Sequence, residues 1–527
     1  MHQSPLPPPP PAHPRAFAPA VVVPLLALGV GGAIVGVQLI SSLGVTPNTS
    51  LVGALVAMAL GRVPLARLAA FRSVHVQNLA QTTTSAATFG AANSLLAPIG
   101  IPFLLGRLDL VLPMLGGAAL AMFLDAYLVY RLFGSSIFPA AGAWPHGVVA
   151  ADAIAAGDAG GAKARRLGVA VACGMVGSWL NLPMAAVGTA IIGNAWALTM
   201  FGVGLLTAGV AAPASGVSLS AHYVPHGVMI GAGLVALGQM AWRPPAVNLE
   251  RAGPAPAGAA VGFTLSVGVA AYMAIATVVA VTGGLTGSLP PIAVVGFVLY
   301  AAVAAYVHEL IVGLAAMHSG WFPAFAVALI TLIGGMLLGF PPVALALLTG
   351  FSAATGPAFA DMGYDLKAGA ILRGAGDPAF DAEGRRQQFL AASVGLATAL
   401  AVVSLVWSDY FASDLVPPAA RVYAATIQSG LVPGVARSLA LWSVPGALLQ
   451  WVGGSHRQLG LLLATGLLVA NPSAGWGVMA GLAARWGWAR AGRVKGDLDA
   501  VAGGLIAGDA LFSFGSSLAR QPGGMAR

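Results

Sequence analysis

Apolar runs about as long as a membrane-spanning helix, roughly 20 residues, follow one another along almost the whole chain. Residues 21–43, 110–130 and 167–191 are three examples. Only 8% of the 527 residues are charged and 58% are hydrophobic, so the chain cannot present a surface suited to water. Its length leaves room for about 12 to 16 transmembrane helices joined by short loops. The sequence therefore predicts an all-α polytopic membrane protein.

The chain also carries signs of an internal duplication. Residues 228–237 (VMIGAGLVAL) read like residues 504–513 (GLIAGDALFS), and the polar stretch at Asn78 lies a similar distance from Asp361. Pseudo-symmetric halves with interrupted segments in matching places are typical of transporters. We therefore divide the chain into a disordered proline-rich tail (1–19), a first transmembrane half (20–243), a linker (244–258), a second transmembrane half (259–515) and a flexible tail (516–527).

Three segments are too polar or too often interrupted for helices that face lipid. They are residues 75–102, 138–158 and 349–374. Such segments are tolerated at membrane depth only where protein encloses them or where they line a cavity, because each unsatisfied backbone group in lipid costs several kcal/mol. We expect broken or re-entrant segments there, with the transport path among them.

Charge, cysteine content and glycine pattern argue against several classes of protein. The net charge of +8 is spread over short loops rather than gathered on one face, which favours cytoplasmic loops over nucleic-acid binding. The single cysteine, Cys173, excludes an intrachain disulfide and an all-cysteine metal site. No glycine-rich phosphate loop follows a plausible strand. We therefore expect no cofactor and no resident metal.

The first apolar run also bears on location. Residues 21–40 are too long for the core of a cleavable signal, and further spans follow at once. We expect an integral, multi-pass protein of a bacterial-type inner membrane, a location with which nothing in the sequence conflicts.

Asp361, Asp365 and Lys367 form the strongest candidate site. A charge at bilayer depth costs about 2.5 to 3.5 kcal/mol, so such groups usually face water, a partner or a substrate. Asp361 and Asp365 are four residues apart and share a helix face, where like-charge repulsion favours a proton on one of them. In the alternative interpretation, Lys367 and Arg373 anchor a loop at the interface with the two aspartates as their partners.

A second set of candidates is uncharged and lies in the first polar segment. These residues supply donors and acceptors that suit a peptide backbone or a chelator, or they hydrogen-bond one helix to another. They are Asn78, Gln81, Thr82 and Ser85, together with Thr83 and Thr84.

Three more acidic residues are candidates for coupling or binding. Asp152 is expected to bind a substrate amino group or a proton, or to make a structural hydrogen bond. Glu309 follows His308 in an apolar run and is a candidate proton site, although Val312 stands where a zinc H-E-x-x-H motif needs its second histidine. Asp509 is expected to be buried and paired, with a proton role as the alternative.

Four stretches resemble motifs of the oligopeptide transporter family, which includes the yellow stripe-like metal-chelate carriers. Asn78-Leu-Ala-Gln-Thr82 with Ser85 resembles N-x-x-Q-T-x-x-S, residues 151–158 (ADAIAAGD) resemble A-E-V-L-K-A-G-E, residues 361–369 (DMGYDLKAG) resemble D-M-x-Q-D-L-K-x-G, and residues 504–511 (GLIAGDAL) resemble the last spanning helix. The likeness extends from near Ser41 to near Phe514. Ala155 replaces a lysine, Asp152 and Asp158 replace glutamates, and Tyr364 replaces a glutamine.

The resemblance implies a secondary transporter of about 16 helices in two related halves, driven by a proton gradient. It also implies a cargo of small peptides or metal-chelate, siderophore-like complexes, with protons and the lipid bilayer as the other partners. The alternative is an intramembrane lipid- or prenyl-modifying enzyme in which the D-x-x-x-D carboxylates hold magnesium, but the chain has no G-x-S-x-G elbow and no soluble lobe. We expect a carrier and not an enzyme, and leave its oligomeric state open.

Overall fold

The computed structural model describes residues 12–43, 50–159, 161–242, 258–320, 323–374, 376–430, 433–491 and 495–519. These residues are almost entirely helical, and the only β-type pairing among them is an isolated bridge between Phe133 and Phe138. Eight helices are long and apolar enough to cross a membrane, and four shorter apolar helices accompany them in the same ranges. The all-α polytopic class is therefore confirmed, with eight candidate spans among the described residues.

The helices fall into two successive sets. The first set is α1 (Pro19–Leu43), α2 (Ser50–Arg62), α3 (Val74–Phe89), α4 (Ala97–Leu104), α5 (Val111–Leu132), α6 (Pro145–Ala159), α7 (Gly161–Trp179), α8 (Met184–Ile192), α9 (Ala195–Leu206), the short α10 (Ala212–Ala214) and α11 (Val224–Trp242). The second set is α12 (Gly258–Thr282), the short α13 (Leu285–Ser288), α14 (Pro291–Ser319), α15 (Ala324–Leu337), α16 (Pro342–Ala354), α17 (Pro357–Arg373), α18 (Pro378–Ala412), α19 (Pro418–Ser429), α20 (Val435–Arg457), α21 (Leu459–Val469), α22 (Pro472–Arg490) and α23 (Lys495–Ala519).

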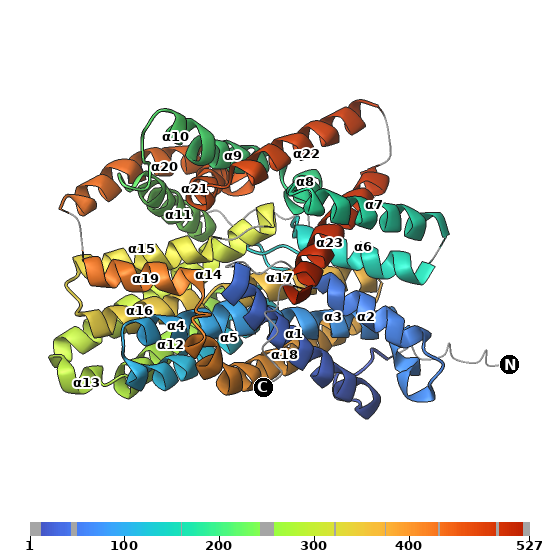
Figure 1. Cartoon of the computed structure of the whole chain (residues 1–527), viewed down its shortest axis with the longest axis horizontal. Coiled ribbons are helices and arrows are strands. Elements are labelled where there is room, and N and C mark those ends of the chain that lie inside the picture. The colour runs from blue at the N-terminus through green and yellow to red at the C-terminus, as the bar shows by residue number, and fades with distance from the viewer. Residues whose placement is uncertain are drawn as a thin grey trace, which may run out of the picture.

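The two sets pack against each other in reciprocal pairs. Helix α7 packs on α23 while α20 packs on α11, α8 packs on α22 while α21 packs on α9, and α5 packs on α12 while α18 packs on α1. In Figure 1 helices α7–α11 and α20–α22 lie together in the upper part of the view, with α1–α5, α12, α16 and α18 below them. Helices α9 and α22 even start alike, each with an asparagine cap, Asn194 and Asn471. Each set of helices thus completes the core of the other, an arrangement typical of pseudo-symmetric transporters.

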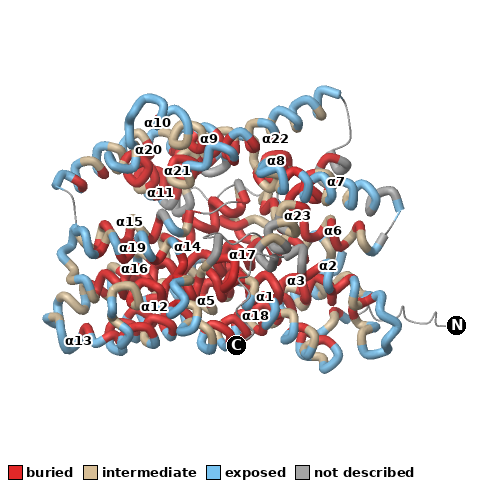
Figure 2. The backbone as a smooth tube through the Cα atoms, viewed as in Figure 1, coloured by how far each residue is buried: buried red, intermediate tan, exposed pale blue. Residues whose placement is uncertain are grey.

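The centre of the molecule is a pair of antiparallel spans. One is residues 74–104, in which α3 and α4 are joined by the π-helical segment η2 (Gly90–Leu96), and the other is residues 342–373, which contains α16 and α17. Helix α3 contacts α17, α4 contacts α16, and η2 contacts both α16 and α17. These are the most enclosed of the long spans, because 83% and 94% of their most apolar stretches are buried, against 61% or less for the others. Figure 2 shows buried residues gathered around α17, α5 and α16.

Both central spans are irregular near their middles, as the polar segments led us to expect. The span of residues 342–373 breaks at Thr355 and Gly356, where Gly356 has φ 96° and is the N-cap of α17. The span of residues 74–104 stays helical and widens into η2 instead of breaking. Irregular backbone is tolerated at this depth because protein encloses both segments. Counted from the first residue of each span, Asp361 takes the same place as Asn93 in η2, while the repeat that relates the polar stretch at Asn78 to Asp361 stays a prediction.

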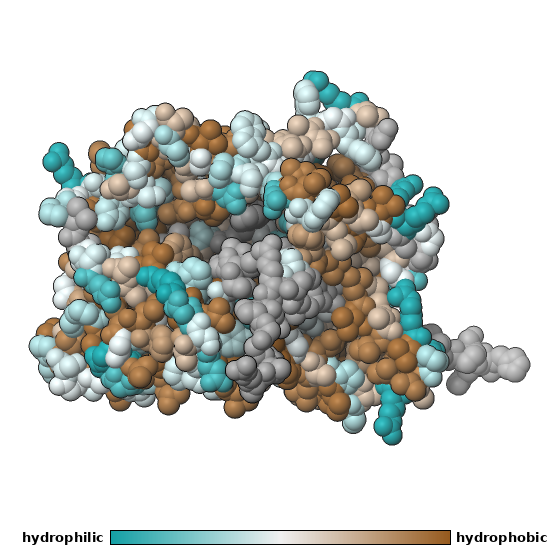
Figure 3. Space-filling model, viewed as in Figure 1, coloured by the Kyte–Doolittle hydropathy of each residue, from teal (hydrophilic) through white to brown (hydrophobic). Residues whose placement is uncertain are grey.

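The outer surface is apolar, as a lipid-facing surface must be. Ile292, Leu405 and Trp451 are each more than 70% exposed. Figure 3 shows broad hydrophobic areas between scattered hydrophilic side chains on the face in view.

The two expected tails are partly ordered, which corrects their boundaries. Ala16 is fully buried and its N–H donates to Gln387 Oε1 at 2.7 Å, and the His13 ring lies 5.1 Å from the rings of His75 and Phe380. Helix α23 continues to Ala519, beyond the expected boundary at 515. Proline-rich composition predicts disorder, but it cannot reveal docking on α18, more than 350 residues away. Residues 1–11, 243–257 and 520–527 lie outside the described residues, so the linker and the division into halves at 243 and 259 stay predictions.

Candidate functional site

Helices α3 and α17 bring four buried polar residues together, which we call the α3–α17 face: Gln81, Ser85, Asp361 and Asp365. Gln81 Nε2 donates to Asp365 Oδ1, and Ser85 Oγ donates to Asp361 Oδ1 at 2.5 Å. Residues four apart share a helix face, and the spans are antiparallel, so a turn forward on α3 matches a turn backward on α17. The structure therefore joins predicted site residues that are 276 and 284 positions apart.

The α3–α17 face offers unused acceptors. Asp361 Oδ2, Asp365 Oδ2 and Gln81 Oε1 have no hydrogen-bond partner among the described residues, and neither has Oδ1 of Asn78, one turn away on α3. A buried polar atom without a partner costs about 1 to 3 kcal/mol. All four atoms are oxygens, and all four accept hydrogen bonds when the two carboxyls are ionised, so in that state the arrangement is complementary to a ligand that donates several hydrogen bonds.

The nearby basic side chains turn away from the aspartates, which corrects the expected grouping with Lys367. Lys367 Nζ donates to the carbonyl oxygen of Ala140 at 2.7 Å. Arg373 Nε pairs with Asp381 at 2.8 Å. The alternative in which Lys367 and Arg373 hold Asp361 and Asp365 is therefore wrong in its pairing. Within the described ranges neither aspartate has a basic partner at salt-bridge distance.

Thr82 has a different part, since it faces α18. Gln388 Nε2, on α18, donates to the backbone oxygen of Asp365 at 2.7 Å and to Thr82 Oγ1 at 3.4 Å. Thr83 Oγ1 donates to the Ala391 carbonyl at 2.9 Å. These contacts match the interpretation of the threonines as links between helices.

Glu309 belongs to a separate cluster that includes a carboxylate not identified from the sequence. Tyr272 Oη lies 2.5 Å from Asp125 Oδ1 and 2.8 Å from Glu309 Oε2, and the Gly356 N–H donates to Asp125 Oδ2 at 2.6 Å. All three side chains are fully buried. Asp125 is the only acidic residue in the apolar run of residues 110–130, and the cost of burying it is the signal that could have found it.

The remaining two predicted acids lie elsewhere. Asp509 is partly buried and paired, since it accepts from Ser178 Oγ and, at 2.8 Å, from the Ala185 N–H, which ties α23 to α7 and α8. Asp152 lies half-buried on α6, which packs against α17 and α3.

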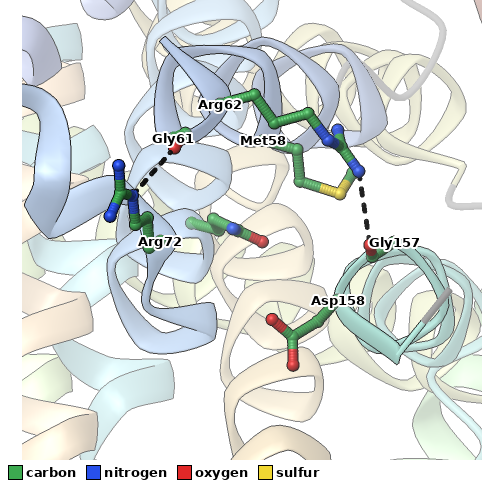
Figure 4. A pocket seen from close by; sticks show the side chains of 7 residues that line it. Met58, Gly61, Arg62, Arg72, Gly157 and Asp158 are labelled. Atoms are coloured by element: carbon green, nitrogen blue, oxygen red, sulfur yellow. Dashed lines mark hydrogen bonds between the residues drawn. The ribbon is translucent and has the colours of Figure 1, made fainter. Parts of the chain in front are cut away.

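A pocket of about 200 Å³ lies beside the start of α3 (Figure 4). Its lining is Met58, Gly61, Arg62, Arg72, Gln77, Gly157 and Asp158. Each of the two guanidinium groups donates a long hydrogen bond of 3.4 Å, from Arg62 to the Gly157 carbonyl and from Arg72 to the Gly61 carbonyl. Gln77 is one turn before Gln81 on α3, so the pocket adjoins the α3–α17 face.

Comparison with known proteins agrees with these features. The family model described as OPT oligopeptide transporter protein matches residues 19–237 and 257–520, which is nearly the whole chain. No curated protein and no solved structure matches. The matched ranges contain both central spans and every candidate residue named above. The chain therefore belongs to the oligopeptide transporter family, whose members are integral membrane transporters.

Proposed function

We propose that the protein is a secondary active, proton-coupled transporter of small peptides, and that the α3–α17 face binds the substrate's amino terminus. The observation that carries the proposal is the pair of buried aspartates, Asp361 and Asp365, each with one unused oxygen and no basic partner among the described residues. Two carboxylates without a counter-charge are costly at membrane depth. A protonated amino group supplies both the missing charge and three donors.

The spacing along α3 bears on peptide length. From Gln77, at the pocket, to Ser85 the helix makes two turns, a rise of about 12 Å. An extended peptide advances about 3.3 to 3.6 Å per residue, so three or four residues match that distance. Arg62 and Arg72 at the pocket suit the carboxyl terminus of such a peptide. We infer a preference for peptides of this length with both termini free.

Metal-chelate complexes fit the α3–α17 face less well. Siderophore-like chelates are rich in oxygen acceptors, which would meet the unused oxygens of Asp361, Asp365 and Gln81 without a donor between them.

The direction of transport follows from the membrane: in a bacterial inner membrane, where we propose the protein resides, the proton gradient would drive uptake into the cell.

The test is uptake into proteoliposomes under an imposed pH gradient. A labelled pool of di-, tri- and tetraalanine, and separately an iron–siderophore complex, would be offered to wild type, Asp361→Asn and Asp365→Asn at equal incorporation. Asp109→Asn is the matched control, because Asp109 is an exposed acid paired with Arg107 at 2.6 Å. We expect gradient-driven peptide uptake that an uncoupler abolishes, that the two site variants lose and that the control keeps.

Acetylation of the peptide amino group separates peptide binding from nonspecific uptake. Blocked peptides should not be taken up, because they lack the ammonium group. Absence of gradient-driven uptake by wild type would overturn the proposed function. Chelate uptake without peptide uptake would overturn the substrate class.

A further inference from the structure

We propose that Asp125, Tyr272 and Glu309 form the binding site for the coupled proton, separate from the α3–α17 face. This proposal rests on the proton coupling proposed above and assigns the proton to named atoms. The three residues come from α5, α12 and α14, and the Gly356 N–H at the start of α17 completes the cluster.

The number of protons in the cluster follows from the hydrogen bonds. Tyr272 has one hydroxyl proton, yet its oxygen lies within hydrogen-bond distance of Asp125 and of Glu309. One hydroxyl proton cannot serve two carboxylates. Both hydrogen bonds of Tyr272 Oη can form only if one carboxyl is protonated and donates to Tyr272 Oη, while Tyr272 donates to the other carboxyl. The conformation observed is therefore the one that holds one extra proton.

The same contacts assign that proton to Glu309. Asp125 accepts from Tyr272 and from the Gly356 N–H, so both of its oxygens have donors. The distance of 2.5 Å to Tyr272 is typical of an O–H donating to a carboxylate, and the 2.8 Å at Glu309 is typical of a neutral pair. The positive end of the α17 dipole also favours the ionised form of Asp125. Glu309 Oε2 thus carries the proton and donates it to Tyr272 Oη.

Few other titratable groups surround Glu309. On its own helix, His308 Nδ1 lies 3.0 Å from Ser352 Oγ on α16, and the Tyr306 ring lies 6.4 Å from that of Tyr272. Helix α16 itself carries no titratable residue. Helix α17 carries Asp361, Tyr364, Asp365, Lys367 and Arg373. Among the described residues no lysine or arginine pairs with either carboxyl of the cluster, so no fixed cation replaces the proton.

Helix α17 connects the proton site to the substrate face. Gly356 precedes α17, and Asp361 and Asp365 follow about 7.5 and 13.5 Å further along the helix axis. When the proton leaves Glu309 Oε2, both Asp125 and Glu309 are ionised and share the single hydroxyl of Tyr272. The repulsion between the two carboxylates then weakens the hydrogen bond between Asp125 and the Gly356 N–H at the start of α17. Protonation restores the closed arrangement. Tyr272 keeps its own proton throughout, so one proton is bound and released per cycle.

The transport test uses Glu309→Gln, which resembles the protonated side chain, with Glu383→Gln as the matched control on the exposed part of α18. Accumulation of di- to tetraalanine driven by a pH gradient is compared with counterflow, the exchange of labelled for unlabelled peptide without a gradient. Counterflow needs no net proton release. We therefore expect Glu309→Gln to reduce accumulation about ten times more than it reduces counterflow. The control should keep the wild-type ratio of accumulation to counterflow. An unchanged ratio in Glu309→Gln would overturn the proposal.

A spectroscopic test does not depend on transport. The background for this test is Asp361→Asn/Asp365→Asn, which removes the carboxyl pair of the α3–α17 face. Infrared difference spectra of this purified protein during a pH titration should contain the C=O stretch of a buried protonated carboxyl. That band should be missing in Glu309→Gln and shifted in Tyr272→Phe, which removes the bridging hydroxyl. Persistence of the band in Glu309→Gln would refute the proton site even if peptide uptake is confirmed. If wild type shows no gradient-driven uptake but the band behaves as expected, the proposed function fails and the proton site stands.

Discussion

Gly356→Ala is the substitution whose cost can be worked out most directly from the structure. Gly356 has φ 96° at the break between α16 and α17, a conformation that costs an alanine about 1 to 3 kcal/mol. A β-carbon there would also lie 3.1 Å from three atoms of Val312, and overpacking of this kind costs about 1 to 3 kcal/mol. We therefore expect the free energy of unfolding to fall by roughly 2 to 6 kcal/mol.

The two parts of that cost can be separated with a second variant. Val312→Ala removes the two γ-methyl groups that the new β-carbon would meet at 3.1 Å and keeps only the Val312 β-carbon, so the double variant Gly356→Ala/Val312→Ala should be less destabilised than the two single changes added together. The backbone strain should remain in the double variant. Gly116→Ala is the matched control, because Gly116 lies inside α5 with nothing within 4 Å of its added β-carbon, and it should be neutral or stabilising by about 0.5 to 1 kcal/mol.

The assay is unfolding in mixed micelles of mild and denaturing detergent, followed by circular dichroism, with all four variants in one detergent. Wild-type stability in Gly356→Ala would refute the argument that the break requires glycine. Strict additivity in the double variant would refute the steric contribution of Val312.

Three further predictions follow from the contacts described above. Ser85→Ala should raise the KM for trialanine about tenfold, because Asp361 loses a charge-assisted hydrogen bond of about 1.5 kcal/mol. Thr83→Ala, on a different face of α3, should leave this KM unchanged. Equal KM values for the two variants would contradict the assignment of Ser85 to the α3–α17 face. Asp509→Ala should lower the free energy of unfolding by about 1 to 3 kcal/mol, since the Ala185 N–H and Ser178 lose their acceptor; a change in peptide KM without a change in stability would refute this structural role. Burial lowers the pKa of His13 below its ordinary 6.5 when residues 12–18 are docked near His75, Arg373, Asp381 and Glu383. The docked segment therefore binds fewer protons than the undocked segment, so docking should weaken as pH falls below 6.5. The protection factor of the Ala16 amide in hydrogen exchange measures this, and a factor that does not change with pH would contradict it.

The sequence predicts more of the α3–α17 face than of the cluster formed by Asp125, Tyr272 and Glu309. Asp361 and Asp365 share a face because their spacing is a property of one helix, and that inference needs no partner helix. The grouping with Lys367 failed for an equally local reason: Lys367 is two residues past Asp365, about 200° around the helix, so its side chain leaves the face and contacts Ala140. Asp125 was not predicted, although it is the one acidic residue of the apolar run 110–130, because it belongs to no recognisable motif.

By itself, the sequence determined the properties that depend on composition and short spacing. These are the helical membrane class, the burial of Asp361, Asp365 and Glu309, the interrupted segment at residues 349–374, and the family, whose model matches nearly the whole chain. Only the tertiary structure decided which buried groups meet. The antiparallel crossing of residues 74–104 and 342–373 brings Gln81 to Asp365, and the packing of α5, α12 and α14 places two carboxyls on one tyrosine. Such contacts join positions far apart in the chain, and they depend on how helices cross, which neither hydropathy nor local spacing encodes.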